Sequence, residues 1–425
     1  MPLASIPAIN ANICSGWNEQ DVAMYNKLDF YLAKMQADRR RTWTVWRRFL
    51  GKVKWSPNMG DTMRSVTKSP SPHLRQFAFP NPITSAPKKD IVQVRERKTD
   101  EVVYRHRFES LVLNFKPSFS DFLDHVDDNS KDIMEKEERF EDIFYRGRIF
   151  HNAPHVWISN RAAGELIAAP QGIGNDAGTS AKTTAWLQGQ IGQLGNPGYL
   201  SFEQLNKALT VGENDIRIPA FSGSDQPKEN IGMADKFVLV CSTEAFNQFT
   251  FDPWLLNNKN CALDIVNERF KGSIFGRITA IMEDMPLRMK GDGTFVAPET
   301  IEQNPDAENY GETIPNPDYV SLATSPYEWA FLVGAQGYDV LEVGPPPSAF
   351  TGSGMPKGFG KMFWNGEIEM TKNILIPCVN DDGTVSWVTN NYGEYLQFIS
   401  QVTYGMRGKQ KRNIIPILFK RKRGQ

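Results

Sequence analysis

The sequence has few of the residues from which disulfide scaffolds, metal centres and membrane spans are built. Four cysteines occur in 425 residues, and no two of them stand at the short spacing of a metal-binding pair. No run approaches the roughly 18 consecutive apolar residues of a membrane-spanning helix. Residues 1–17 lack a basic start followed by an apolar core, so we expect no secretory signal. These absences favour synthesis in a reducing compartment and argue against a membrane partner.

Histidine is also scarce, and its placement argues against acid–base catalysis. All five histidines lie before residue 156, outside the segment with the clearest strand and helix patterns. The glycine-rich segment 352–361 does not end as a phosphate-binding loop does, because Met362 stands where Ser or Thr is required. The Gly-x-Ser-x-Gly elbow of many hydrolases is absent. We therefore expect no enzyme, no cofactor and no metal.

The residues that are present predict a folded α+β protein. Hydrophobic residues make up 40% of the chain and charged residues 23%, and the length allows about two to four lobes. Residues 235–282 show a strand, two short helices and a second strand, which is typical of a mixed α/β lobe. Pro416 interrupts the last apolar run, which predicts an edge strand because proline cannot donate to a sheet.

The strongest helical pattern covers residues 118–150. Apolar side chains recur there at intervals of three, four and seven residues and form one stripe, which includes Phe140 and Phe144. The opposite face carries acidic residues such as Glu138 and Asp142. At about 1.5 Å per residue this helix would be roughly 50 Å long, more than a small domain needs. We interpret it as a structural beam.

Residues 43–115 predict a long projecting β-loop. Residues 56–90 are rich in proline and show little periodicity, and a compact domain seldom keeps such a segment unless it is a functional arm or loop. Residues 91–97 and 102–113 then alternate as strands. The polar residues 98–101 between them predict a hairpin turn.

The charge is distributed unevenly along the chain, although the total is only −1. The net charge is +10 over residues 1–120, −5 over 121–153, −14 over 154–405 and +8 over the last twenty residues. Such asymmetry is typical of contact with nucleic acid or with an oppositely charged neighbouring subunit. Neutralisation within one molecule is the alternative.

Two sets of residues are candidates for such contacts. Aromatic residues and arginine are enriched at protein interfaces, and basic side chains can neutralise phosphates. A solubilising tail and aromatic stacking on bases are the alternatives for the same residues. The candidate anchors between subunits are Trp43, Trp46, Trp55, Phe77 and Phe79. The candidate charge contacts, to a neighbouring subunit or to DNA, are Arg47, Arg48, Lys52, Lys54, Arg407, Lys409, Lys411 and Arg412.

The order of these elements resembles the major capsid proteins of tailed bacteriophages, the Hong Kong 97-like fold. The resemblance rests on the arm, the projecting loop, the long helix, the strand at residues 236–240 and the strands at 329–343. It implies an N-terminal arm (1–50), an extended β-hairpin loop (51–117) and a peripheral domain (118–234) with a spine helix (118–150). It also implies an axial domain (235–375), followed by return strands and a basic tail (376–425).

The resemblance further implies a function in assembly. The chain would form the hexamers and pentamers of an icosahedral head in the host cytoplasm, enclose double-stranded DNA through non-specific charge contacts, and reside in the virion. Some members of that family begin with a long scaffold-like coiled segment, and the early helix predicted at residues 19–41 is too short for one. A separate scaffolding protein is therefore implied, with a portal and a decoration protein as further candidate partners. Another phage structural protein, a portal or tail component, is the main alternative. A nucleic-acid-binding protein is a second alternative.

Overall fold

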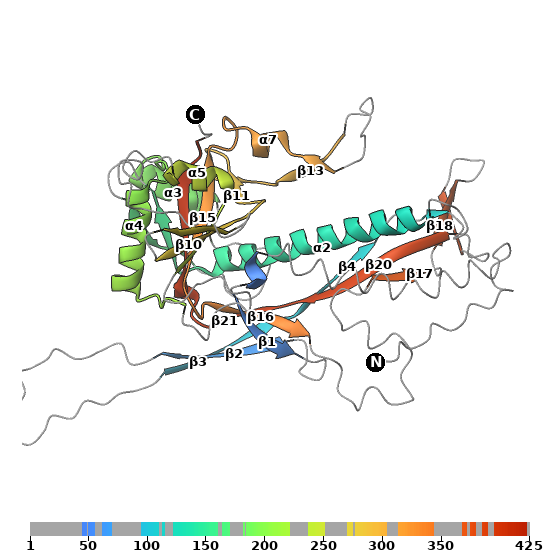
Figure 1. Cartoon of the computed structure of the whole chain (residues 1–425), viewed down its shortest axis with the longest axis horizontal. Coiled ribbons are helices and arrows are strands. Elements are labelled where there is room, and N and C mark those ends of the chain that lie inside the picture. Colours follow the sequence, from blue (N-terminus) through green and yellow to red (C-terminus); the bar gives the residue numbers. More distant parts are fainter. Residues whose placement is uncertain are drawn as a thin grey trace, which may run out of the picture.

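The structure is a computed structural model, and it shows a mixed α and β protein with a lobe at one end of a long helix (Figure 1). It describes residues 45–48, 50–55, 62–69, 95–109, 113–114, 122–159, 164–170, 182, 184–221, 237–250, 270–274, 277–303, 313–343, 368–371, 375–379, 385–389 and 395–422. The candidate anchors Trp43, Phe77 and Phe79 lie outside these residues.

The lobe is built on a nine-stranded mixed sheet. Its main path runs in the order β7-β6-β22-β15-β8-β10-β9, and β11 and β12 extend it beside β15. The strands are β6 (His155–Ile158), β7 (Glu165–Ala168), β8 (Phe237–Cys241), β9 (Phe270–Ile274), β10 (Ile278–Met282), β11 (Leu287–Met289), β12 (Phe295–Val296), β15 (Tyr327–Val333) and β22 (Ile414–Lys420). The helices α3 (Thr184–Leu194), α4 (Phe202–Val211) and α5 (Thr243–Thr250) pack around it (Figure 1).

The central strands are mostly apolar, with Thr279 in β10 and Glu328 in β15 as exceptions, because both of their faces are covered. Every residue of β8, β10 and β15 is buried. The prediction that Pro416 marks an edge strand is wrong, because β22 lies between β15 and β6. Parallel pairing with β6 involves only Ile417 and Leu418. The ladder on that side therefore begins after the proline.

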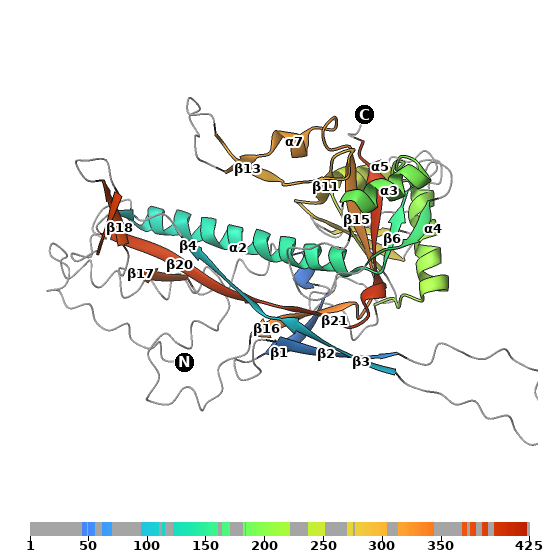
Figure 2. The ribbon, with the colours of Figure 1, turned by 180° about the vertical axis from the view of Figure 1, so that it is seen from behind.

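The long helix is confirmed as α2 (Phe122–Asn152), 31 residues and about 46 Å long. Beside it runs a four-stranded sheet of β4 (Tyr104–Glu109), β5 (Leu113–Asn114), β17 (Ile368–Thr371) and β20 (Tyr395–Tyr404). The predicted stripe packs on this sheet: the Phe140 and Phe144 rings lie 5.2 and 5.8 Å from the ring of Tyr404. Figures 1 and 2 show α2 and β20 extending together from the lobe.

The expected domain boundaries do not coincide with the sheets. The lobe sheet takes β6 and β7 from the expected peripheral segment, β8 to β15 from the expected axial segment, and β22 from the tail. The boundary at residue 235 therefore separates strands of one sheet. The chain leaves the lobe sheet after β15 and forms, as β16 (Tyr338–Val343), the middle strand of a three-stranded sheet with β1 (Gly51–Trp55) and β21 (Met406–Gly408). It contributes β17 and β20 beside α2 and returns to the lobe sheet as β22.

Three of the six sheets in the described part of the chain are two-stranded ribbons. They are formed by β2 (Thr62–Ser69) with β3 (Arg95–Val102), by β13 (Glu299–Ile301) with β14 (Thr313–Pro315), and by β18 (Leu375–Val379) with β19 (Val385–Thr389). The predicted turn at residues 98–101 is wrong: these residues are part of β3 and pair with Ser65, Val66 and their neighbours in β2. The hairpin instead joins β2 to β3 across residues 70–94.

None of the helices in the described residues combines the length and the apolar character that crossing a membrane requires.

Candidate functional site

The N-terminal segment is fastened to the middle of α2 by one carboxylate. The backbone N–H groups of Val45 and Trp46 donate to Asp142, at 3.0 to 3.1 Å. Trp46 begins the short 3-10 helix η2 (Trp46–Arg48), whose first N–H groups have no partner within the helix. Asp142 supplies the missing acceptor, so the charge on α2 determines where this segment docks.

Trp46 lies at the centre of this contact between the N-terminal segment and α2, which we call the junction. Its position corrects the expectation that Trp46 anchors a neighbouring subunit. Its side chain is fully buried and meets the ring of Phe331 edge to face, with centroids 5.1 Å apart. The indole Nε1 donates to Oε1 of Glu283 at 3.1 Å. An indole enclosed by its own chain cannot anchor a neighbouring subunit, so the prediction of Trp46 as an inter-subunit anchor is wrong.

The surroundings of Trp46 are ionic. Arg146 donates to the same Glu283 oxygen at 2.7 Å, and both side chains are almost fully buried. Arg47 pairs with Glu141 at 3.3 Å within the same chain, so the structure gives this candidate charge contact an internal partner. Burial, together with the nearby charges of Glu283 and Glu141, raises the pKa of Asp142 to about 7. Near neutral pH Asp142 is therefore only partly ionised, while Glu283 and Glu141 each pair with an arginine.

A second docking point follows directly in β1 (Gly51–Trp55), which pairs in parallel with β16. A Cβ atom at Gly51 would collide with the carboxylate of Asp339, so only glycine allows this close approach. Asp339 is almost fully buried, and Arg407 and Lys409 from the tail pair with it at 2.8 and 2.9 Å.

The tail residues that were expected to reach DNA or a neighbour therefore make contacts within the chain. Arg407 and Lys409 neutralise Asp339, and Lys411 donates to Asn152 at the end of α2 at 3.2 Å. A buried carboxylate needs such partners, which accounts for this internal use of the tail. Arg412 and Lys52 are exposed. The backbone of Arg48 lies in η2, and that of Lys54 and Trp55 lies in β1.

Another buried ionic cluster lies at the end of the lobe, and no pattern in the sequence indicates it. Arg421 donates to Glu244 of α5 at 2.9 Å, and Arg288 of β11 donates to Glu328 of β15 at 2.9 Å. Arg421 also donates to the backbone carbonyl of Ser325 at 2.8 Å. These residues lie far apart in the sequence, so only the sheet order brings them together. The cluster fastens the end of the tail to the lobe.

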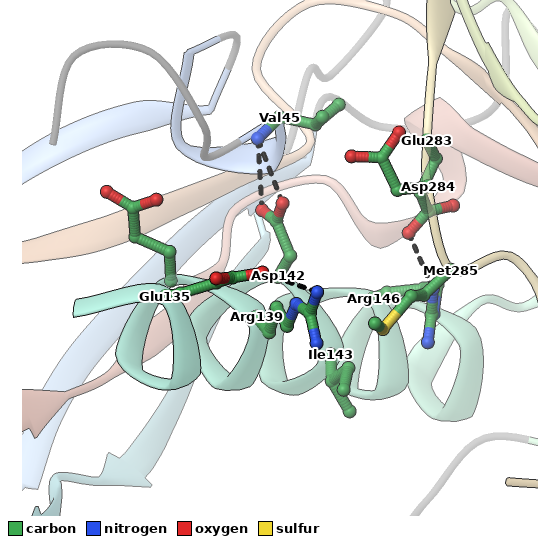
Figure 3. Close-up of a pocket in the computed structure, with 10 residues that line it drawn as sticks. Val45, Glu135, Arg139, Asp142, Ile143, Arg146, Glu283, Asp284 and Met285 are labelled. Atoms are coloured by element: carbon green, nitrogen blue, oxygen red, sulfur yellow. Dashed lines mark hydrogen bonds and ion pairs between the residues drawn. The ribbon is translucent and has the colours of Figure 1, made fainter. Parts of the chain in front are cut away.

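A cavity of about 300 Å³ adjoins the junction, between α2 and the segment that follows β10 (Figure 3). Glu138, Asp142, Glu283 and Asp284 are among its walls. Among the described residues, no group of three or more His, Cys, Asp or Glu side chains could hold a metal ion. The cavity is thus acidic without being arranged as a metal centre.

Shell proteins of known structure are similar to this chain over most of its length, at low sequence identity. The capsid of Ralstonia phage GP4 aligns with 89% of this chain and 91% of that chain, at 10% identity and a TM-score of 0.42. The acidic stable capsid of Helicobacter pylori bacteriophage KHP30 aligns with 89% of both chains, at 9% identity and a TM-score of 0.39. The SrpI encapsulin complex from Synechococcus elongatus aligns with 89% of this chain and 88% of that chain, at 10% identity and a TM-score of 0.42. No protein-family model and no curated protein matches the sequence.

Proposed function

We propose that the chain is a capsid protein with a Hong Kong 97-like fold, which assembles with copies of itself into a closed shell around double-stranded DNA. The observation that carries this proposal is the ribbon of β2 and β3, which projects away from the lobe and from α2 (Figure 1). An isolated two-stranded hairpin is marginally stable in water. The ribbon touches its own chain at β21 (Met406–Gly408), and its eight-residue strands would gain stability from a surface on another molecule.

The charges of the projecting parts favour a second copy of this chain as that surface. The ribbon segment, residues 62–102, carries eight basic and four acidic side chains. Residues 291–325, which include the ribbon of β13 and β14, carry seven acidic side chains and no basic one. Opposite charges on two projecting parts of one chain make copies complementary to each other.

The rigid parts of the fold suit a shell. The helix α2 and the sheet beside it form an elongated body, while the junction at Trp46 and the pairing of β1 with β16 fix the root of the ribbon to that body. Because such a body is stiff, contacts made at its two ends would keep the same spacing and orientation between neighbouring copies throughout a shell. Hexamers and pentamers would require slightly different versions of these contacts.

Other partners follow from the same proposal. A separate scaffolding protein, a portal and a decoration protein are proposed partners, and exposed basic residues such as Arg412 and Lys52 are candidates for non-specific contact with packaged DNA. The virion is the proposed location, after assembly in the host cytoplasm.

Removing residues 70–94, which connect the two strands of the ribbon, tests the proposal. Replacement of residues 70–94 by Asn-Gly closes the hairpin at the Ser69–Arg95 pair with a turn that suits a two-residue connection. We expect the variant to melt as the parent chain does and to form no shells in negative-stain micrographs. A matched control replaces residues 380–384, between β18 and β19, by the same two residues and keeps residues 70–94. Shells formed normally by the chain that lacks residues 70–94 would refute the proposal.

The parent chain, co-expressed with a scaffolding protein, distinguishes the alternatives. Closed shells containing nuclease-resistant DNA support the capsid, whereas rings of about twelve subunits indicate a portal. Shells filled with protein and free of DNA indicate a cargo compartment. A monomer that binds DNA and dissociates as salt rises indicates a nucleic-acid-binding protein.

A further inference from the structure

The end of the tail enters the lobe through the side chain of Arg421. β22 is followed by Arg421 and Lys422, the last described residues. Lys422 and the preceding Lys420 are exposed, and their ammonium groups lie 5.9 and 5.7 Å from the centre of the exposed ring of Tyr199. The side chain of Arg421, between the two lysines, is about 1% exposed. The contact of the tail end with the interior of the lobe therefore depends on Arg421.

The guanidinium group of Arg421 holds the turn that follows the short helix α7 (Pro317–Val320). It donates to the backbone carbonyls of Tyr319 at 3.2 Å, Val320 at 3.3 Å and Ser325 at 2.8 Å. The last carbonyls of a helix have no donor within the helix, and basic side chains can supply one. One side chain from the end of the tail thus joins both sides of this turn.

Arg421 is also half of a balanced cluster of buried charges. It donates to Glu244 of α5 at 2.9 Å. Arg288 donates to Glu328 at 2.9 Å and to the same Glu244 at 3.2 Å. Two carboxylates therefore share two guanidinium groups, and loss of Arg421 would leave both carboxylates with Arg288 alone. Removing one partner from a buried cluster of this kind is strongly destabilising.

The turn lies at the root of a segment that we call the acidic projection, residues 299–320. It comprises β13, β14 and α7 and carries six acidic side chains and no basic one. β13 and β14 pair with each other in a sheet of their own, and Figures 1 and 2 show β13 and α7 extending from the lobe on one side of α2. The position of this segment therefore depends on how its ends are held.

Further out, the acidic projection is joined to the body by ion pairs on the surface. Glu299 pairs with Arg139 of α2 at 2.6 Å. Asp318 pairs with Lys290 at 3.0 Å. All four side chains are at least 36% exposed, and exposed ion pairs contribute little to stability. The buried contacts at the root should therefore dominate the position of the projection.

We propose that Arg421 is a positioning residue, and that the end of the tail acts as a latch for the acidic projection. With Arg421 in place, the turn after α7 is fixed. When the end of the tail is absent or withdrawn, three backbone carbonyls lose this donor and the root of the projection loosens. The lobe sheet stays folded, because β22 pairs with β15 along its whole length. Tyr319 keeps its own hydrogen bond to the carbonyl of Pro286, so the root loosens without detaching.

The latch links the end of the tail to the association of copies, and this step rests on the proposed function. There, acidic residues of the projection are contacts between copies. A loosened segment must be ordered again when it binds, and that ordering costs free energy. Opening the latch should therefore weaken association without changing any side chain at the contact itself.

Hydrogen exchange of the unassembled chain, followed by mass spectrometry, tests the latch. One variant ends at Lys420 and lacks Arg421, and the matched control ends at Lys422 and keeps it. We expect the chain that ends at Lys420 to exchange faster in residues 313–325 by about tenfold or more, beyond any change in β6 and β10, because a buried charged partner is lost. The chain that ends at Lys422 should exchange as the parent does.

Two full-length variants show whether the guanidinium group is responsible, and they replace the truncated chain if it does not fold. Arg421→Gln should exchange in residues 313–325 as fast as the chain that ends at Lys420. Arg421→Lys keeps the charge beside Glu244 but lacks the planar fork of donors, so its exchange should lie between those of the parent and Arg421→Gln. The latch is overturned if Arg421→Gln exchanges in residues 313–325 as the parent does, or if β6 and β10 speed up by the same factor.

Association of copies separates the latch from the proposed function. In light scattering at about 50 mM salt, where exposed charges are weakly screened, Arg421→Gln should associate about tenfold more weakly than the parent. The chain that ends at Lys422 should associate as the parent does. Faster exchange in residues 313–325 with association like that of the parent would support the latch and refute the acidic projection as a contact between copies. Exchange like that of the parent would refute the latch, whatever the association.

Discussion

Protonation of Asp142 should make the stability of the chain depend on pH in a direction opposite to that of an ordinary carboxylate. Its pKa is about 7 in the folded chain, against 3.8 for the exposed group. Between these values the folded chain holds a proton that the unfolded chain has lost, so the free energy of unfolding falls as pH rises. Over the whole interval the fall is about 4 kcal/mol at most, at about 1.4 kcal/mol for each pH unit.

Asp142→Asn isolates this contribution. The amide oxygen still accepts from the N–H groups of Val45 and Trp46, and the side chain no longer titrates. Urea unfolding at pH 5, 6, 7 and 8, followed by tryptophan fluorescence in amine-free buffer, gives the difference between the parent and the variant. We expect the variant to gain up to about 3 kcal/mol relative to the parent from pH 5 to pH 8, because only the two pH units between 5 and the folded-state pKa of about 7 contribute.

The comparison has a matched control and a clear contrary result. Glu203→Gln removes an exposed carboxylate that pairs with Lys207 on the surface of α4, so its difference from the parent should stay within about 0.5 kcal/mol at every pH. Burial also raises the pKa of Glu328, but that residue is common to the parent and to both variants and cancels in the differences. If the difference between the parent and the Asp142→Asn variant is flat from pH 5 to pH 8, Asp142 stays ionised in the folded chain and the reasoning fails.

Three further substitutions test the packing. Trp46→Ala should lower the free energy of unfolding by about 3–5 kcal/mol in urea, while Trp46→Phe, which loses the hydrogen bond to Glu283, should cost about 1–2 kcal/mol. Gly51→Ala should speed hydrogen exchange in β1, because the new methyl group meets Asp339. The control Gly189→Ala, with open space around the new methyl group, should leave exchange in β1 unchanged. Equal exchange rates in β1 of the two variants would contradict the close approach of Gly51 to Asp339. Arg421→Met leaves Glu244 without this partner and should lower the melting temperature by several degrees, while Lys422→Met should leave it nearly unchanged.

The elements with long, regular patterns could be predicted from the sequence. The apolar stripe of α2 shows a period near 3.6, and the side chains of that stripe do pack on β20 and β4. The strand at Phe237–Cys241 is an uninterrupted apolar run, which is typical of a strand covered on both faces. In both elements the buried residues are close together in the sequence, so a local pattern of apolar side chains is enough to predict the element.

The hairpin turn and the edge strand could not be predicted, because each depends on a distant partner. Residues 98–101 are polar and resemble a turn, but pairing with β2 extends them as a strand. Pro416 is compatible with a central strand only because β6 begins to pair after it. In both places the partner strand overrides the local signal.

The same limit explains the junction and the tail. An arginine or tryptophan among basic residues has the composition of an interface, but composition does not say whether the partner surface belongs to another molecule. Here the acidic partners Asp142, Glu283 and Asp339 come from α2, from the end of β10 and from β16 of the same chain. Part of the charge asymmetry of the sequence is thus neutralised within one molecule, at the root of the ribbon.

Residues 62–102 carry a surplus of basic side chains and residues 291–325 a surplus of acidic ones. Two of these acidic residues, Glu299 and Asp318, pair within the chain with Arg139 and Lys290. The strands that the structure describes in the two segments, β2 with β3 and β13 with β14, lie on opposite sides of α2 (Figure 1), so we expect the remaining charges to meet between neighbouring copies. The melting temperature of the single chain should therefore depend little on salt. Association of copies should weaken strongly between about 50 and 500 mM salt, because charges on exposed surfaces become screened over roughly this range. Light scattering at a series of salt concentrations, with thermal melting of the unassembled chain beside it, measures both. Association that is insensitive to salt would mean that apolar contacts, rather than these charges, hold the copies together.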